Sequence, residues 1–115
     1  MQPPGNWQEL KDFAEPLKEK GGAEWRISLQ PGGTGSWQSF LPFAWQAGGD
    51  VVSDDQFTLD TPEVQKALDY YASFFAEGIS PSELAEGAQD SGFVDGSIGA
   101  FVSGPWHMGI LEEQG

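Results

Sequence analysis

The sequence predicts an α/β fold in which a small sheet is covered by helices. Segments with helical spacing of apolar residues alternate with segments of period two, in the order α-β-α-(β)-α-β-α. The 16 glycines and 8 prolines mark frequent turns between these segments. The 115 residues, with five Trp and eight Phe, suit one domain with a modest core.

Two helices have clear start signals. Asn6 is a suitable N-cap, and Glu9 three residues later completes a capping-box pattern; this helix ends at Gly21-Gly22. The other helix opens at Thr61-Pro62-Glu63, with a cap, a proline and an acid in its first turn, and ends at Gly78. The apolar faces comprise Trp7, Leu10, Phe13, Ala14 and Leu17 in the first helix, and Val64, Ala67, Leu68, Tyr71, Phe74 and Phe75 in the other.

Strands are predicted in three places. "AEWRISLQ" alternates polar residues with Trp25, Ile27 and Leu29, which indicates one buried face, and "PGGTG" ends this strand with a turn. A second strand is expected near residues 98–102, after a turn at Asp95-Gly96. "DVVSDDQFTLD" predicts two short extended pieces around an acidic turn.

Two further helices follow strand-like segments. One is predicted from Ser36 to about Ala47, with Pro42 inside it and Gly48-Gly49 after it. The last helix begins at Gly104-Pro105 and runs towards Glu113. Between the strands, "SPSELAEGAQD" predicts short helical turns or loop.

The composition excludes several classes of partner. The net charge of −13 disfavours nucleic acid and anionic membranes, and we interpret it as a contribution to solubility. The absence of cysteine excludes disulfides, thiol catalysis and cysteine-based zinc sites. The opening "MQPPGNWQEL" lacks the basic start and apolar core of a signal peptide, and we expect the chain to be a piece of a longer protein.

Signals for catalysis or cofactor binding are weak. Ser103 and His107 lack a nucleophile-elbow pattern, and His107 is interpreted as a packing or surface residue. "GGTGSW" lacks the Gly-Lys-Ser/Thr of a phosphate loop. Four acidic residues lack the spacing of a calcium loop and indicate a solvated turn: Asp50, Asp54, Asp55 and Asp60. We therefore expect no enzyme activity, no metal and no cofactor.

Two tryptophans stand at predicted helix starts. Trp37 follows the Gly-rich turn, and Trp106 follows a strand. In open α/β layers, ligands bind at the edge where strands lead into helices, and helix N-termini there offer free N–H groups. An indole beside such donors suits a sugar, whose apolar face lies on the ring while its hydroxyls bond to polar neighbours such as Ser36 and Gln38. The residues alone leave open the alternative that both tryptophans belong to the core.

Four segments in order resemble extracellular solute-binding proteins of ABC importers that take up oligosaccharides such as maltose and trehalose. "PPGNWQELKDFAEPLKEKG" is similar to their P-x-T-W-x-E-L segment, and "FLPFAWQAGGDVV" to their helix that ends in Gly-Gly. "LDTPEVQKALDYYASFFAEGISP" is similar to a further helix, and "GFVDGSIGAFVSGPWHMGIL" to their strand-to-helix signature with Gly-Pro-Trp. Asn6 replaces the usual Thr cap, and Phe101 stands where Met is frequent.

The resemblance implies one lobe of a periplasmic-binding-protein-like fold. Residues 1–115 would form a single domain, part of the carboxy-terminal lobe of a two-lobed protein that closes on sugar. The lobe would form one wall of the cleft, and the whole protein would deliver a maltose- or trehalose-like oligosaccharide to an ABC permease. The resemblance further implies a non-enzymatic protein outside the cytoplasm, either periplasmic or a cell-surface lipoprotein.

The resemblance also implies candidate ligand-binding residues. Trp106 is expected to stack on sugar, as the Trp of Gly-Pro-Trp often does in the family, and Gly104 allows close approach of the backbone. By looser alignment, Ser36, Trp37 and Gln38 also face the cleft. Asp50 is either a hydroxyl acceptor or part of a surface turn. We assign Trp7 and Trp25 to the core, and Trp45 to the core or the cleft wall.

Two other classes of function remain as alternatives. A structural or interaction module would have no ligand and would self-associate through exposed apolar surface. An enzyme would need a pair of carboxylates placed across a cleft.

Overall fold

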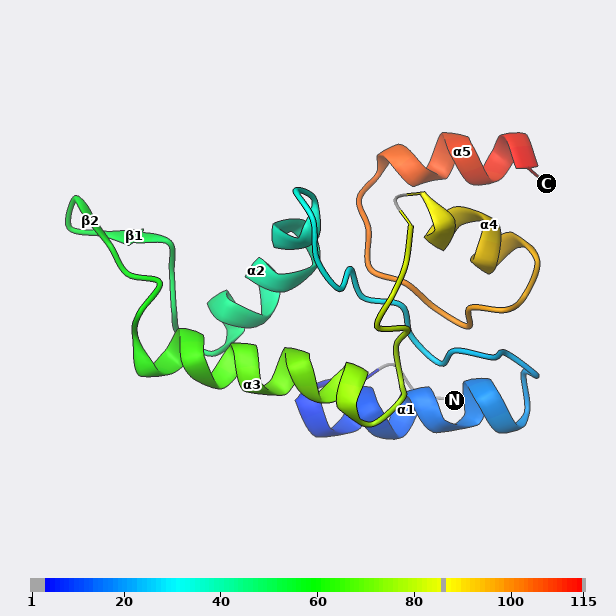
Figure 1. Ribbon diagram of the computed structural model, residues 1–115, viewed down its shortest axis with the longest axis horizontal. Helices are drawn as coiled ribbons and strands as arrows, with labels where there is room; N and C mark the ends of the chain where they lie inside the picture. The colour runs from blue at the N-terminus through cyan, green and yellow to red at the C-terminus, as the bar shows by residue number, and fades with distance from the viewer. Residues whose placement is uncertain (1–3, 86, 115) are drawn as a thin grey trace.

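The computed structural model describes residues 4–85 and 87–114 and confirms the predicted α/β class, with several helices and a small sheet (Figure 1). Glu86, within the predicted loop, and the first three residues of the turn-like opening lie outside the described residues. The elements are α1 (Trp7–Glu19), α2 (Ser36–Gln46), β1 (Val52–Ser53), β2 (Gln56–Phe57), α3 (Pro62–Ala76), α4 (Ala88–Val94) and α5 (Trp106–Gln114). In the described ranges, no helix combines the length and apolar character needed to cross a bilayer.

The helix starts predicted at Asn6 and Thr61 are confirmed. The Asn6 side chain accepts the N–H of Glu9 at 2.9 Å, and Thr61 Oγ1 accepts the N–H of Val64 at 3.5 Å. In a capping box the Glu9 carboxylate would accept the N–H of the N-cap residue Asn6. Here it accepts the N–H of Gly5, one residue earlier, at 2.8 Å.

The core lies where α1 and α2 pack on α3. From α3 it buries Val64, Ala67, Tyr71 and Phe74, as the helical spacing predicted. Leu68 was wrongly included in that buried face: it is 44% exposed, because it lies at the edge of the face that the other four residues define. The core cluster comprises Ala14, Ile27, Leu29, Phe43, Ala44, Ala67, Tyr71, Phe74 and Ile79.

Trp7 packs against this core, as predicted. Its indole stacks on Tyr70 with ring centroids 4.3 Å apart, and its Nε1 donates to Gln46 Oε1 at 2.7 Å. The assignment of Trp45 to the core is wrong. Trp45 is 52% exposed: the buried positions of α2 are Ser39, Phe43 and Ala44, and the Trp45 indole donates to Asp50 Oδ1 at 3.2 Å.

The predicted strands at 23–30 and 98–102 lie side by side and parallel, but they form isolated bridges between Trp25 and Ile98 and between Ser28 and Phe101. The N–H of Trp25 donates to Ser97 O at 2.9 Å, whereas that of Ile27, two residues later, donates to Ile79 O at 3.3 Å. In a regular strand these two N–H groups would point to the same neighbour, so the change of partner interrupts the ladder. Three distant segments therefore meet at residues 25–29, 79–80 and 97–101.

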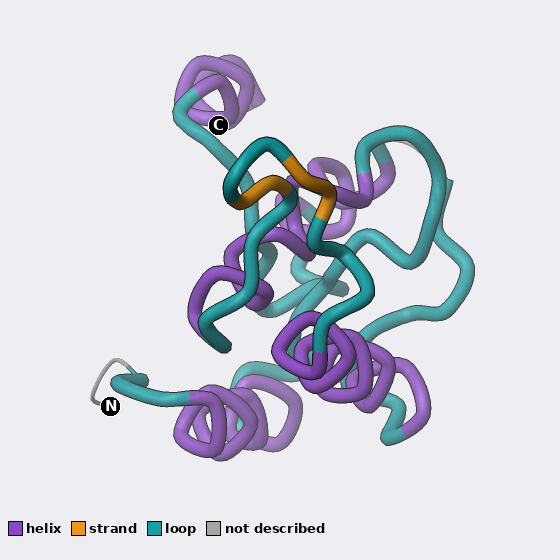
Figure 2. Tube along the Cα trace, turned by 90° about the vertical axis from the view of Figure 1, so that its left-hand side faces the viewer, coloured by secondary structure: helices purple, strands orange, loops and turns teal. Residues whose placement is uncertain are grey.

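The acidic segment after α2 forms a two-stranded hairpin, as predicted. Val52 pairs with Phe57, and Asp54 and Asp55 both have positive φ values, of 51° and 61°. Asp and Asn tolerate this region better than most residues, which suits a tight hairpin turn. The hairpin projects beyond α3, at the opposite end of the picture from α4 and α5, in Figure 1, and it lies nearest the viewer in Figure 2. The hairpin is therefore remote from α4 and α5.

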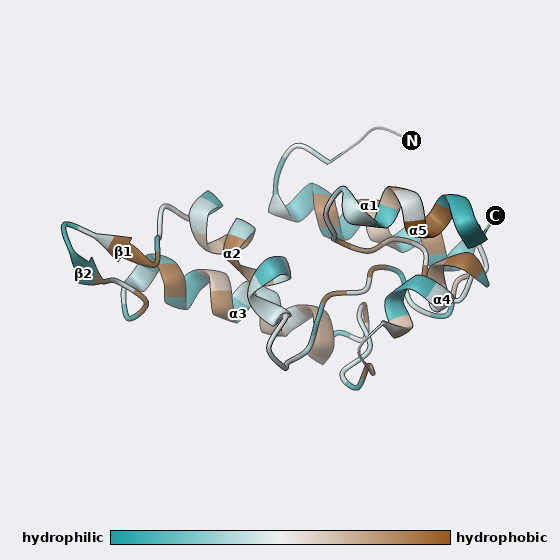
Figure 3. Cartoon of the chain, turned by 90° about the horizontal axis from the view of Figure 1, so that it is seen from above, coloured by the Kyte–Doolittle hydropathy of each residue, from teal (hydrophilic) through white to brown (hydrophobic). Residues whose placement is uncertain are grey.

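Helices α4 and α5 pack together at the opposite end of the molecule from the hairpin (Figure 1). Both mix hydrophobic and hydrophilic residues, as the hydropathy colouring in Figure 3 shows. Helix α5 buries none of its residues completely. Its attachment to the rest of the chain therefore depends on partly buried side chains, which are His107, Ile110 and Leu111.

Candidate functional site

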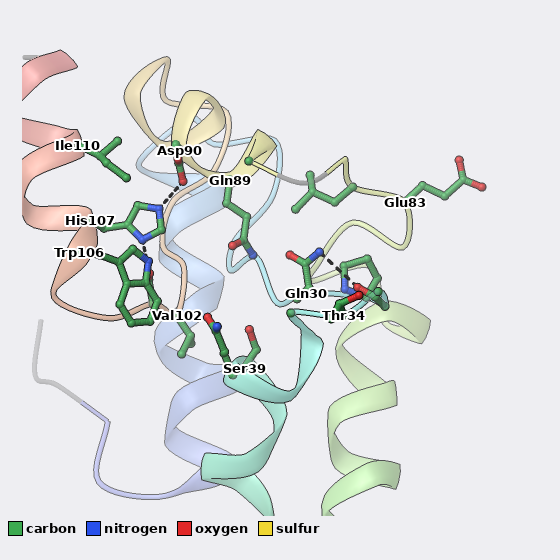
Figure 4. Close-up of a pocket in the computed structure, with 18 of the residues that line it drawn as sticks. Gln30, Thr34, Ser39, Glu83, Gln89, Asp90, Val102, Trp106, His107 and Ile110 are labelled. Atoms are coloured by element: carbon green, nitrogen blue, oxygen red, sulfur yellow. Dashed lines mark hydrogen bonds and ion pairs between the residues drawn. The ribbon is translucent and has the colours of Figure 1, made fainter.

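A pocket of about 670 Å³ opens between the Gly-rich turn at 31–35, the start of α2, the segment before α4, and the start of α5 (Figure 4). Its lining is rich in amide and hydroxyl groups, which can donate and accept hydrogen bonds. The neutral polar side chains that line it are Gln30, Thr34, Gln38, Ser39, Ser82, Gln89 and Ser103.

A second pocket, of about 810 Å³, lies between α1 and α2. Its lining is largely hydrophobic and includes Trp7, Leu10, Pro42 and Phe43. The first pocket is the better candidate for a polar solute, because convergent polar groups give a site its orientation and specificity.

Trp106 forms part of the wall of the polar pocket. Its side chain is 54% exposed, so one part of the indole remains open to solvent at the first turn of α5. The indole folds back over Gly104, where a Cβ would overlap its six-membered ring. The N–H of His107 donates to Gly104 O at 3.2 Å and so begins the turn that carries the indole. The Gly-Pro-Trp sequence thus fixes an indole at the mouth of the pocket.

A hydrogen-bonded chain of three side chains forms another part of the wall. His107 Nε2 lies 2.5 Å from Asp90 Oδ1, and its Nδ1 is hydrogen-bonded to Ser103 Oγ. The His107 and Asp90 side chains are only 16% and 21% exposed. The chain joins α4 to α5 across the pocket wall, as Figure 4 shows for Asp90 and His107.

The floor of the pocket is tied to the core by further hydrogen bonds. Gln89 Nε2 donates to the hydroxyl of buried Ser28 at 3.0 Å. The Tyr71 hydroxyl donates to Gln30 O at 2.6 Å, and burial raises the pKa of Tyr71 to about 12. These bonds hold polar side chains from three distant segments around one space.

The sequence-predicted residues fall in two places. Trp106 and Gln38 line the polar pocket, with Gly104 beneath the indole. Ser36 and Trp37 lie at the same end of α2 but do not line the pocket: Ser36 donates to Gly33 O at 2.9 Å, and Trp37 is 55% exposed. Asp50 lies beyond the other end of α2, where its carboxylate accepts from Trp45 Nε1 at 3.2 Å and from the N–H of Val51 at 2.7 Å.

Sequence reasoning missed Asp90 and Gln89. It considered Ser103 and His107 only as a catalytic pair, and the structure joins their side chains by a hydrogen bond. Nothing in the sequence places α4 beside α5, so Asp90 could not be assigned to His107. Within residues 4–85 and 87–114, no group of three or more His, Cys, Asp and Glu side chains is placed to hold a metal.

Comparisons with known proteins give one consistent family. The model of a family described as bacterial extracellular solute-binding protein matches residues 1–115. A putative binding protein of Brucella abortus (strain 2308) is 25% identical over 116 residues, which cover 97% of this chain and 28% of the relative.

Two other relatives have more specific names. The putative ABC transporter periplasmic-binding protein YcjN of Escherichia coli (strain K12) is 31% identical over 99 residues, covering 84% of this chain and 23% of the relative. The maltotriose-binding protein of Pyrococcus abyssi (strain GE5 / Orsay) is 32% identical over 124 residues, which cover 99% of this chain and 24% of the relative. The chain thus spans about a quarter of the length of these curated relatives. No solved structure matches it significantly.

Proposed function

The chain belongs to the bacterial extracellular solute-binding proteins, and from this membership we propose that the polar pocket beside Trp106 is one wall of a carbohydrate-binding cleft. The observation that carries the proposal is the half-exposed indole of Trp106 beside amide and hydroxyl side chains. An indole face fits the apolar C–H face of a sugar ring, and the surrounding polar groups can bond to its hydroxyls.

The proposed site residues have different roles. Trp106 stacks on the sugar, and Gly104 gives the indole its position. Gln38 and Gln89 offer amide groups to hydroxyls inside the pocket. Ser36 and Trp37, at the start of α2 but outside the pocket lining, form a rim where a longer saccharide would extend. Asp50 lies too far along α2 to join this site.

The proposed solute is an oligosaccharide of the maltose or trehalose type. The support comes from the similarity to a relative named maltotriose-binding protein and from the resemblance of four sequence segments. In the proposed whole protein, the chain is part of the carboxy-terminal lobe, which closes with a second lobe around the sugar outside the cytoplasm. That protein would then deliver the sugar to an ABC permease and would catalyse no reaction itself.

A nitrogen–proton NMR titration of the five tryptophan indoles tests this function. We expect maltotriose or trehalose to shift the Trp106 signal saturably and to leave Trp7 and Trp25 unmoved. We expect a dissociation constant weaker than about 1 μM, since one wall supplies only part of the contacts of a closed cleft.

Trp106→Ala and Trp45→Ala form a matched pair for this test, because the two side chains are 54% and 52% exposed. Trp106→Ala should abolish the sugar-dependent shifts of the remaining pocket residues, whereas Trp45→Ala should preserve them. Equal effects of the two substitutions, or no shift at any indole at high millimolar sugar, would reject the proposed site.

A second candidate is self-association without a ligand. It is favoured by α5, which buries no residue completely and exposes Met108 and Trp106. Apolar area of this kind is stabilised when a partner covers it. Light scattering across a concentration series tests this candidate, and a monomer at every concentration would contradict it.

A further inference from the structure

The lining of the polar pocket contains acidic side chains but no lysine or arginine among the described residues. It includes the carboxylate of Asp90 and, at the rim, the exposed side chain of Glu83, whose carboxylate points away from Trp106 in Figure 4. The five basic residues all lie elsewhere. Lys11 pairs with Glu77 and Arg26 with Glu15, Lys66 lies over the Trp7 ring, and the other two, Lys18 and Lys20, belong to the last turn and cap of α1.

The hydrogen-bonded chain of Asp90, His107 and Ser103 adds to this asymmetry. The carboxylate of Asp90 can only accept, so His107 Nε2 must carry the proton of that bond. In the neutral imidazole, Nδ1 then has only a lone pair, and the Ser103 hydroxyl must donate to it. The remaining capacity of Ser103 Oγ is therefore to accept, and this atom belongs to a residue of the pocket lining.

We propose that the pocket selects uncharged polyhydroxy solutes against anionic ones, through the carboxylate of Asp90 and the acceptor oxygen that His107 leaves on Ser103. This inference rests on the proposed function, because it concerns the same site. Sugar hydroxyls can donate to these oxygens, whereas a uronate or phosphate group brings only acceptors and a like charge. The chain's overall charge of −13 acts in the same direction at longer range.

The expected size of the effect follows from the Coulomb energy. One carboxylate at 4 Å from a second one weakens binding about fivefold in a water-like dielectric, and more where the pocket excludes water. Repulsion between exposed charges is screened by salt, so the discrimination should shrink when the salt concentration is raised to about 1 M.

The test uses the full chain and two probes that differ in one group. The first probe is maltotriose, and the second is maltotriose whose non-reducing-end C6 is oxidised to a carboxylate. The Trp106 indole shift measures both dissociation constants. We expect the acid to bind at least about fivefold more weakly. Equal or tighter binding of the acid overturns the selectivity and leaves the proposed function intact, whereas binding of neither probe rejects both.

Matched variants locate the effect. Asp90→Asn removes the pocket charge, and Ser103→Ala removes the acceptor oxygen. Glu24→Gln is the control, because it changes the net charge equally at an exposed position outside the pocket. The two pocket variants should bring the affinities of the two probes closer, and Glu24→Gln should not. If Asp90→Asn fails to fold, Ser103→Ala decides, and a result equal to that of Glu24→Gln rejects the inference.

Discussion

The six-membered ring of Trp106 lies over Gly104, in the space that the Cβ of any other residue would occupy. The glycine therefore determines where the indole can lie. Pro105 between them fixes φ near −65° and begins the helix without leaving an unpaired N–H. The orientation of the proposed stacking surface thus depends on the tripeptide as a unit.

Gly104→Ala should displace the indole, because the new methyl group overlaps the ring. We expect the Trp106 indole signal to shift in the free protein and the sugar affinity to fall about tenfold, equivalent to about 1.4 kcal/mol. Gly109→Ala is the control on the same helix, since no atom lies within 4 Å of its Cβ. Unchanged indole signals in Gly104→Ala would contradict the steric argument.

His107→Ala should loosen α5. It removes the bonds to Asp90 and Ser103 and leaves a largely buried carboxylate without its partner. We expect a loss of about 1–2 kcal/mol in the free energy of unfolding and faster amide exchange in α5. Met108→Ala, a neighbouring change at an exposed side chain, should cost less than about 0.5 kcal/mol. Similar exchange rates in both variants would show that the three-residue chain does not hold α5.

Tyr70 and Tyr71 should lose their hydroxyl protons only at a pH well above the ordinary pKa of tyrosine. Burial raises the pKa values of Tyr70 and Tyr71 to about 12, and the charge of Glu77 adds to the effect at Tyr70. The folded protein therefore holds these protons more tightly than the unfolded chain. The contribution of the two tyrosines to the free energy of unfolding should be fully present below pH 10, which is the pKa of tyrosine in the unfolded chain. It should be lost as the pH rises from about 10 to about 12. Ultraviolet titration of folded and urea-unfolded protein checks this difference, and coincident curves would refute it.

Gly99→Ala should weaken the pairing of the parallel segments. A Cβ at residue 99 would lie 2.9 Å from Arg26 O and 3.0 Å from Leu17 Cβ, so the two backbones could not approach as closely. We expect a cost of about 1–3 kcal/mol in urea unfolding. Gly32→Ala is the control, because its Cβ would meet no atom within 4 Å, and it should be neutral or slightly stabilising. Equal stability of the two variants would exclude a close approach at Gly99.

The features predicted correctly from the sequence are those with local causes. The starts of α1 and α3 depend on Asn6 and Thr61, whose bonds span three residues, and the hairpin turn depends on adjacent aspartates. For α2, the sequence correctly predicted a helix that begins at Ser36, and both Trp37 and Trp45 belong to it. It could not tell which face packs inward, and both side chains prove exposed.

The features that escaped prediction join distant segments. The sequence pattern places Ser28 on the polar, solvent-facing side of a strand. It is completely buried in the structure, where the side chain of Gln89, 61 residues later, donates to its hydroxyl. Asp90 likewise gains its role only because α4 packs on α5. The polar lining of the pocket was therefore hidden from sequence patterns, whereas Trp106 and Gln38 were recognisable at their helix starts.

The parallel bridges also have a consequence for how the chain folds. Trp25 pairs with Ile98 across a separation of 73 residues, and Ile27 bonds to Ile79 across 52. Closing such long loops costs entropy before the contacts repay it, while helices form from neighbouring residues. The rate of folding should therefore be limited by the meeting of these segments. During synthesis, residues 25–28 must wait until residues 97–101 have emerged before their pairing is complete.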